Sequence, residues 1–246
     1  MNRKATAFKK KRVVLLPWDE LPEFMKTPEV LPYWEILWKC RTQLRIKRVF
    51  DVIMSIFLIM LLFIPMLVIA VVIKLDSKGP VIYRQVRVGQ YGKKFKINKF
   101  RTMIDSAAVV DDNGVQVGTS VTLANDDRIT KVGRILRKYR MDEFPQLFNV
   151  LRGDMSFVGT RPEVPKYVEQ YRNEWNATLL LPPGITSECS IIFKDEGKLL
   201  NSASDVDQVY VEKVLPKKMQ INLKSLRKFS FAYDVHTMIR TVVEIS

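Results

Sequence analysis

The sequence predicts a helix-rich α+β protein that a re-entrant, broken helix anchors in a membrane. Three observations predict this class. An uncharged apolar run extends over 52–73, a short β-hairpin pattern follows it, and amphipathic helical patterns then surround a pair of adjacent carboxylates. With 246 residues, of which 47% are hydrophobic, the chain is long enough to bury a sizeable core.

The apolar run from Val52 to Ile73 indicates the membrane helix. Its 22 residues carry no charge, and a helix of that length is roughly 33 Å long, enough to cross a bilayer core of ~30 Å. Pro65 lies in the second half, where a proline kinks or breaks a helix. Both flanks are basic, although a simple span should show charge asymmetry. We therefore expect a helix that breaks at Ile64–Pro65 and returns to the same side. A wholly buried soluble helix is the alternative.

Charged residues just before the run complete the expected anchor. Lys47 and Arg48 stand three to four residues before Asp51, so they can pair with it on one helix face. Further upstream, residues 1–12 form a basic tail that suits anionic lipid headgroups. Trp34 and Trp38, at i and i+4, either lie at the membrane interface or pack on a core.

The overall charge narrows the class of partner. The 40 basic and 26 acidic residues give a net charge of +14, which implies nucleic acid, an anionic membrane surface or phosphorylated substrates. Cys40 and Cys189 are far apart and form no CxxC pair, which excludes a zinc ribbon or a thioredoxin-type site. A single histidine, His236, excludes a histidine-based metal site.

Two basic elements follow the apolar run. Residues 81–88 and 95–100 alternate on either side of a glycine-containing turn and predict a β-hairpin. Residues 128–140 predict an amphipathic helix, which Asp127 can cap, with a basic face that suits a bilayer surface or an anionic site. The polar face of the hairpin is either simply solvated or faces a phosphate group. Its basic residues are Arg84, Arg87, Lys96, Lys99 and Arg101.

The adjacent carboxylates Asp142 and Glu143 are the candidate chemical centre. Pro145 just after them and Gly153 further on predict a short helix over 144–152, with the pair at or just before its N-terminus. The helix dipole and nearby arginines should keep both carboxylates ionised. Taken alone, such a pair is usually a helix cap and a solvated neighbour.

The loop after this helix favours a chemical role for the pair. It contains Gly153, Gly159, hydroxyl side chains and Arg161, which together suit an anionic group. Ionised carboxylates facing a cation cluster of this kind suggest phosphoryl chemistry with a divalent metal.

Several stretches follow one another in order: KRVFD, GPVIYRQVRVGQYGKKFKINKFRTM, DDRITKVGRILRKYRMDEFPQLFNVLRGDMSFVG, TRPE and LPPGIT. In these, from about residue 44 onward, the chain resembles the bacterial sugar transferase family, the monotopic polyprenyl-phosphate phosphoglycosyl transferases. The resemblance implies a re-entrant membrane anchor and an active site at the cytoplasmic surface. It also implies transfer of a phosphosugar from a nucleotide diphosphate sugar, most often of uridine, to a polyprenyl phosphate, with release of the nucleoside monophosphate.

The resemblance also implies roles for individual residues. Asp142 resembles the nucleophile that forms a phosphosugar-aspartyl intermediate, and Glu143, with Asp142, resembles the Mg²⁺ site. Four cations resemble phosphate or nucleotide contacts: Arg137, Arg161, Lys99 and Arg101. The chain departs from the family pattern at Ile64, where the family has Ser, at Thr160, where it has Pro, and over Ser187–Phe193.

These interpretations give one expected organisation. Residues 1–44 form an N-terminal extension, 45–76 the re-entrant membrane helix and 77–246 a cytoplasmic catalytic domain, at the inner face of a bacterial plasma membrane with both termini cytoplasmic. The alternatives are a membrane-tethered basic nucleic-acid-binding protein and a membrane scaffold. A nucleic-acid-binding protein does not explain the carboxylate pair beside Gly- and Arg-bearing loops, and the chain has no clear recognition helix after a turn, so we expect no nucleic-acid partner. A scaffold predicts that Asp142→Asn changes nothing.

Overall fold

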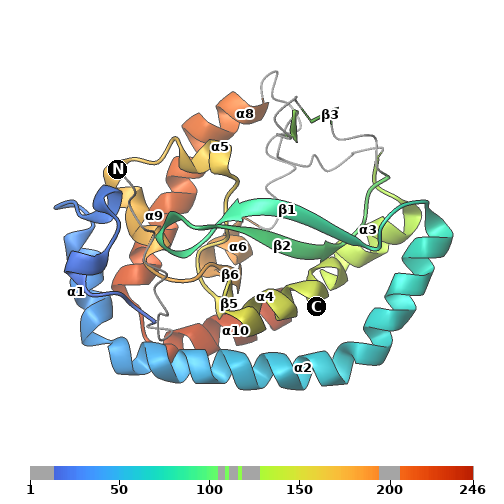
Figure 1. Cartoon of the computed structure of the whole chain (residues 1–246), viewed down its shortest axis with the longest axis horizontal. Helices are drawn as coiled ribbons and strands as arrows, with labels where there is room; N and C mark the ends of the chain where they lie inside the picture. The colour runs from blue at the N-terminus through green and yellow to red at the C-terminus, as the bar shows by residue number, and fades with distance from the viewer. Residues whose placement is uncertain (1–13, 105–108, 111–115, 118–127, 194–205, 246) are drawn as a thin grey trace, which may run out of the picture.

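The computed structural model describes residues 14–104, 109–110, 116–117, 128–193 and 206–245. Its longest element is helix α2 (Arg41–Asp76), which contains the whole apolar run. This helix follows one edge of the molecule, bends, and continues along a second edge (Figure 1). Pro65 lies inside α2 and removes one backbone hydrogen bond from it, which is the usual cause of such a bend. The expected helix-rich class is confirmed, with one long apolar helix.

Short elements surround α2. The other α-helices are α1 (Leu31–Lys39), α3 (Lys131–Lys138), α4 (Leu147–Arg152), α5 (Pro165–Val168), α6 (Glu188–Ile192), α8 (Val206–Val209), α9 (Leu215–Arg227) and α10 (Phe231–Ile245). The 3₁₀ and π turns are η1 (Trp18–Glu20), η2 (Glu23–Met25), η3 (Gln90–Gly92), η4 (Met141–Gln146), η5 (Asn173–Leu179) and the π turn η6 (Tyr210–Val214). The strands are β1 (Ile82–Val88), β2 (Lys94–Phe100), β3 (Val109–Val110), β4 (Gln116–Val117), β5 (Ser156–Val158) and β6 (Gly184–Thr186).

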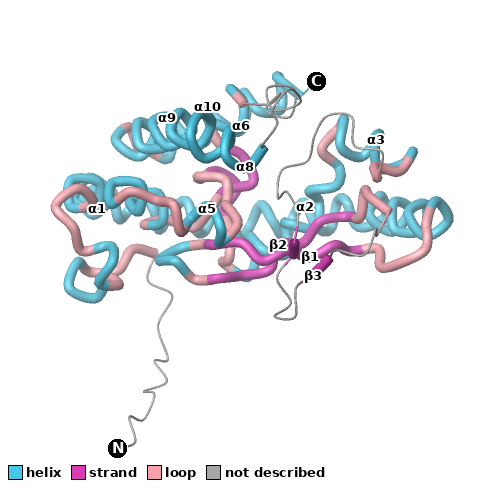
Figure 2. Tube along the Cα trace, turned by 90° about the horizontal axis from the view of Figure 1, so that it is seen from above, coloured by secondary structure: helices cyan, strands magenta, loops and turns pink. Residues whose placement is uncertain are grey.

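The predicted β-hairpin is confirmed. Strands β1 and β2 pair antiparallel, with Ile82 opposite Phe100 and Val88 opposite Lys94. The hairpin crosses the middle of the molecule in Figure 1, and Figure 2 shows it on the opposite side from α9 and α10. A second, parallel pair joins β5 to β6, with Ser156 opposite Gly184. Parallel strands end at a common edge, so the loops after β5 and β6 lie side by side.

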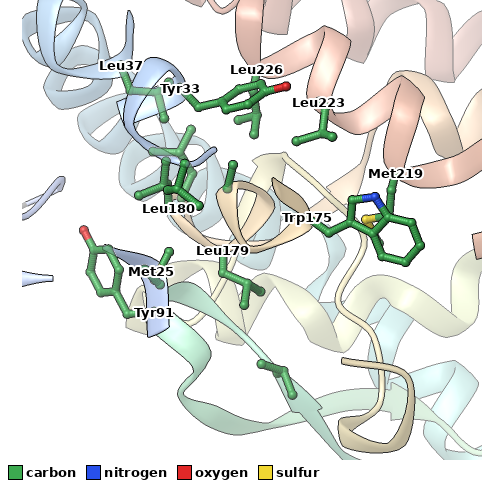
Figure 3. Packing of buried hydrophobic residues seen from close by; sticks show 14 of the residues in the cluster. Met25, Tyr33, Leu37, Tyr91, Trp175, Leu179, Leu180, Met219, Leu223 and Leu226 are labelled. Carbon is green, nitrogen blue, oxygen red and sulfur yellow. The ribbon is translucent and has the colours of Figure 1, made fainter. Parts of the chain in front are cut away.

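The N-terminal segment packs into the main hydrophobic core. Met25 and Leu37 are fully buried there, and Tyr33 and Leu37 lie beside Leu180 and Leu226 (Figure 3). The rings of Trp34 and Trp38 stack at 4.9 Å, and both pack against the same core. The structure therefore favours the core-packing alternative for these tryptophans. The basic tail over 1–12 lies outside the described residues.

Helix α3 is shorter than the sequence indicates. It begins after Thr130, whose hydroxyl accepts the N–H of Gly133 at 2.9 Å and caps the helix. The expected start near 128 is therefore wrong, because the capping hydroxyl stands two residues later. Asp127, the expected cap, lies outside the described residues.

Candidate active site

The carboxylate pair lies in a 3₁₀ turn rather than at the start of an α-helix. The turn η4 spans Met141–Gln146 and contains both carboxylates as well as Pro145, and α4 begins only at Leu147. The expected helix over 144–152 is therefore wrong at its start. Arg140, with φ 52°, reverses the chain just before the turn, and the tighter turn holds both carboxylates against strand β2.

Two cations from different parts of the chain hold Glu143. Its Oε1 lies 3.0 Å from Nζ of Lys99 on β2 and 3.1 Å from Nη2 of Arg161, in the loop after β5. Asp142 has a weaker contact, with its Oδ2 3.8 Å from Nζ of Lys99. Both carboxylates are more than nine-tenths buried. The structure thus brings together four of the predicted site residues.

The surroundings shift the pKa values of the two carboxylates in opposite directions. Burial by itself would raise the pKa of Glu143, but Lys99 and Arg161 outweigh it and hold that pKa well below its ordinary value. Burial raises the pKa of Asp142, because Lys99 offsets only part of the effect and the charge of Glu143 adds to it. The surroundings therefore lower the pKa of Glu143, as expected, whereas burial shifts the pKa of Asp142 in the opposite direction.

Of the two other predicted cations, one reaches the site and one does not. Arg137 donates from Nε to Oγ1 of Thr102 at 2.9 Å, and its charge lowers the pKa of Asp142. Arg101 turns away instead. Its guanidinium donates to the backbone oxygens of Lys78 and Ser77 at 2.7 and 2.6 Å, which caps the C-terminal end of α2.

The loop that carries Arg161 is fixed by Arg87, from the basic face of the hairpin, and by residues that the sequence analysis did not single out. Arg87 donates to the carbonyl oxygen of Pro162 at 3.1 Å. Oε1 of the buried Glu163 accepts from the hydroxyl of Tyr210 at 2.7 Å and from Nζ of Lys218 at 3.1 Å. Lys218 follows Glu163 by 55 residues. No local pattern indicates that pairing, because α9 meets this loop only in the folded chain.

The predicted anchor residues clamp α2 to the site. Nζ of Lys47 lies 2.6 Å from Oδ2 of Asp234 on α10, so its ion pair is with that residue rather than the expected Asp51. Arg48 donates to the carbonyl oxygens at the end of α4, those of Val150 and Leu151, at 2.7 and 2.9 Å. Asp51 accepts the N–H of Phe157 on β5 at 3.3 Å. Each charge reaches an element distant in sequence.

The remaining surface of α2 is apolar. The buried side of the helix carries the polar Lys47, Asp51 and Ser55 as well as Leu44, Met66 and Ile73, whereas Ile64 and many other large apolar side chains point outward. Only 11% of the most apolar window is buried. A soluble helix shows the reverse arrangement, because its apolar face is the one that packs. The outward face of α2 therefore suits a membrane. The exposed residues are Ile46, Val49, Ile53, Ile56, Phe57, Met60, Leu61, Phe63, Ile64, Leu67, Val68, Val71, Val72 and Leu75.

The donor set at the site limits how a metal could bind. Among the described residues, no group of three or more His, Cys, Asp or Glu side chains could hold a metal ion. Asp142 and Glu143 still offer two neighbouring carboxylates. Mg²⁺ is commonly held by one or two carboxylates together with substrate phosphates. These residues therefore fit a Mg²⁺ ion whose coordination a diphosphate would complete.

Together, the outward apolar face of α2 and the cation-held carboxylate pair define a membrane-associated protein with a site for an anionic ligand. Four cations, Lys99, Arg137, Arg140 and Arg161, act on only two carboxylates, so the site has an excess of positive charge. The chain belongs to the bacterial sugar transferase family, which matches residues 42–246.

Curated relatives of the chain include enzymes that act on different sugars. The UDP-N-acetylgalactosamine-undecaprenyl-phosphate N-acetylgalactosaminephosphotransferase of Aeromonas hydrophila is 34% identical over 200 residues, which cover 80% of this chain and 43% of the relative. The UDP-glucose:undecaprenyl-phosphate glucose-1-phosphate transferase of Klebsiella pneumoniae is 45% identical over 148 residues, 59% of this chain and 30% of the relative. The undecaprenyl-phosphate galactose phosphotransferase of Salmonella typhimurium is 40% identical over 149 residues, 57% and 31%. The chain spans less than half the length of these relatives.

Proposed function

We propose that this protein transfers a sugar 1-phosphate from a uridine diphosphate sugar to a polyprenyl phosphate and releases UMP. One observation carries the proposal, namely the unequal pairing of the two carboxylates. Glu143 is held by Lys99 and Arg161, whereas Asp142 has only a 3.8 Å contact with Lys99. One carboxylate is thus fixed and the other is left to react. The relatives' names support the substrate classes.

The proposed reaction has two displacement steps. A carboxylate oxygen of Asp142 attacks the phosphorus attached to the sugar, and the bond from that phosphorus to the bridging oxygen breaks. UMP leaves with the bridging oxygen and its electron pair, and an aspartyl-phosphosugar remains. An oxygen of the polyprenyl phosphate then attacks the same phosphorus and restores the Asp142 carboxylate. The product is a polyprenyl diphosphosugar.

The surrounding cations have distinct roles in this proposal. Lys99 and Arg161, which hold Glu143, are placed to turn toward the oxygens of an incoming diphosphate, and Arg137 adds positive charge beside Asp142. A Mg²⁺ ion held by Glu143 and Asp142 would supply further neutralisation of the diphosphate charge. Asp142 attacks as the carboxylate, and the same cations favour this ionised form.

We further propose that α2 enters and leaves the bilayer on the cytoplasmic side of the bacterial inner membrane, with both termini cytoplasmic. The bend of α2 and the basic residues on both flanks support this placement (Figure 1). The reaction would then join a soluble donor to a lipid acceptor at the surface. It would be the first membrane step of a glycoconjugate pathway, such as exopolysaccharide, O-antigen or glycoprotein synthesis.

The test is UMP release from protein held in lipid nanodiscs with Mg²⁺, polyprenyl phosphate and a panel of uridine diphosphate sugars. Wild type should release UMP with at least one sugar, and Asp142→Asn should be slower by about 1,000-fold or more. Asp19→Asn, at an exposed position in η1, is the matched control and should match wild type. UMP release by Asp142→Asn at the wild-type rate would contradict the covalent role, and no release by wild type would contradict the reaction.

A further inference from the structure

Gln146, the last residue of η4, is an unsatisfied polar group inside the protein. Its side chain is only 1% exposed. Neither amide atom, Oε1 nor Nε2, has a hydrogen-bond partner among the described residues. A buried amide without partners destabilises a fold, and nearly all such groups in proteins are paired. The position therefore calls for an explanation other than stability.

The spacing along the turn places Gln146 beside the carboxylates. Residues three apart share one face of a 3₁₀ turn, so Gln146 follows Glu143, the neighbour of Asp142, and Asn149 continues that face into α4. Asn149 is bound to β2, because it accepts the N–H of Asn98 at 3.0 Å and donates to the carbonyl of Lys96 at 2.9 Å.

Strand β2 therefore supports this face at both ends. Lys99, one residue beyond Asn98, contacts the carboxylates of Asp142 and Glu143. Gln146 lies between these two attachments of the turn to β2.

Asp142 has a matching deficiency. Within the part of the chain that the structure describes, the carboxylate of Asp142 accepts no hydrogen bond. Its ion pair with Lys99 is long, at 3.8 Å. Lys99 and Arg161 are committed to Glu143 in the resting protein. A diphosphate at the site would draw these cations further from Asp142. A neutral donor buried in the same turn would then be available to orient its carboxylate.

We propose that Gln146 is a positioning residue for Asp142, whose amide N–H donates to the carboxylate oxygen that does not attack phosphorus. The inference rests on the proposed function. In the aspartyl-phosphosugar that oxygen becomes a carbonyl oxygen, which a neutral amide donor still satisfies. The unpaired amide of the resting protein is, on this account, a donor reserved for the reacting state.

The decisive variant is Gln146→Met, which keeps a similar volume and removes both polar atoms. We expect a higher melting temperature than wild type, because an unsatisfied amide has been removed. We also expect kcat to fall about tenfold or more, with KM for the donor sugar within about twofold of wild type. Trapping with donor labelled in the sugar should show a smaller covalent fraction. Gln146→Leu repeats the test with a second apolar side chain.

Gln90→Met is the matched control. The amide of Gln90 donates to the carbonyl oxygens of Val14 and Leu180, each at 2.9 Å, so its contacts are already complete in the resting protein. This variant should lose stability and keep the kcat of the folded enzyme. The two substitutions, chemically identical, should therefore move stability in opposite directions.

Two results would overturn the inference. A less stable Gln146→Met protein with full kcat would show that the amide serves packing or holds a buried water molecule. A raised KM with unchanged kcat would show that Gln146 binds substrate rather than positions Asp142. If wild type transfers no phosphosugar, or if Asp142→Asn remains active, it is the proposed function that fails, and this is measured before the Gln146 variants are compared.

Discussion

Glu163 shows how a single buried charge fixes the loop that carries Arg161. Burial by itself would raise the pKa of Glu163, but Lys218, Arg87 and the hydrogen bonds from Tyr210 and Lys218 outweigh it and lower that pKa. The charge of Glu163 in turn favours the protonated form of Arg161. The Glu163 carboxylate therefore links its own loop to strand β1, through the charge of Arg87, and to helix α9, through Lys218.

This pairing makes stability depend on pH. Because the folded pKa of Glu163 lies below its ordinary value of 4.5, its contribution is complete above that pH and is lost as the pH falls through the folded pKa. Glu163→Gln should remove this part of the acid sensitivity and, at pH 7, should cost about 1.5–3 kcal/mol, because Lys218 loses its 3.1 Å ion pair with Glu163. Thermal unfolding from pH 3 to 7 measures both effects.

The double variant Glu163→Gln/Lys218→Met is the control for this prediction. It removes both charges, so it should recover part of the stability that the single variant loses at pH 7. Equal losses in the single and double variants would mean that the remaining charge of Lys218 does not account for the loss in the single variant.

Single residues also mark the limit of sequence reasoning about the site. Lys99 and Arg101 stand two apart, so strand alternation places both on one face. Strand β2 ends at Phe100, however, and Arg101 follows the departing chain back to the end of α2. The carboxylate pair could be predicted because it is contiguous. The opposite pKa shifts of Asp142 and Glu143 could not be predicted, because the pKa of Asp142 depends on its burial in the folded chain.

Among the elements, α2 was the most predictable and its contacts the least. Length and the absence of charge are local properties, and they indicated the apolar helix with a proline inside it. The partners of Lys47, Arg48 and Asp51 lie more than 100 residues away and form only in the folded chain.

The re-entrant arrangement of α2 predicts that its two ends lie on one side of the membrane. Arg45→Cys and Lys78→Cys place thiols at exposed positions before and after the apolar run. In inverted-membrane and intact-cell preparations of a variant whose own cysteines are replaced, both thiols should react with an impermeant maleimide from the cytoplasmic side only. Labelling from opposite sides would mean that α2 spans the bilayer.

The contact between α3 and the hairpin exit predicts a strict size limit at one position. A Cβ added at Gly133 would lie 2.1 Å from the carbonyl oxygen of Thr102, so Gly133→Ala must push the two segments apart. Thr102 also holds Arg137, so that cation should move and activity should fall by about tenfold or more. Initial rates of UMP release measure the effect. Lys131→Ala, at an exposed position of α3, should keep full activity, and an unaffected Gly133→Ala would show that α3 does not position Arg137.

At the scale of the whole molecule, the core extends beyond the region that matches the family. The match begins at residue 42, yet Met25, Val30 and Leu37 are fully buried against residues from the C-terminal half. The Pro- and Trp-rich composition upstream of residue 40 did not reveal this, because only short 3₁₀ turns precede α1 and they show no helical or strand period. Their role is visible only once η5 and α9 cover them.

A chain that begins at residue 41 keeps the whole matched region but should not fold stably. Burial of each side chain such as Met25 or Leu37 contributes about 1.5–3 kcal/mol, and a typical domain has only about 5–15 kcal/mol of net stability. Expression and gel filtration in detergent should show aggregation. A chain that begins at residue 14 keeps the buried segment and should behave as wild type. Monodisperse, active protein from residue 41 onward would contradict the prediction.

Arg48 joins the depth of the protein in the membrane to the chemistry at its surface. It stands on α2 and holds the end of α4, while the start of α4 continues directly from the turn that carries the carboxylates. A bilayer that is too thin or too thick for α2 would tilt or displace that helix. Through the hydrogen bonds of Arg48 to α4, this should shift Asp142 relative to its cations. The lipid composition of the host membrane thereby becomes a determinant of turnover, and reconstitution in lipids of graded acyl-chain length would have an optimum.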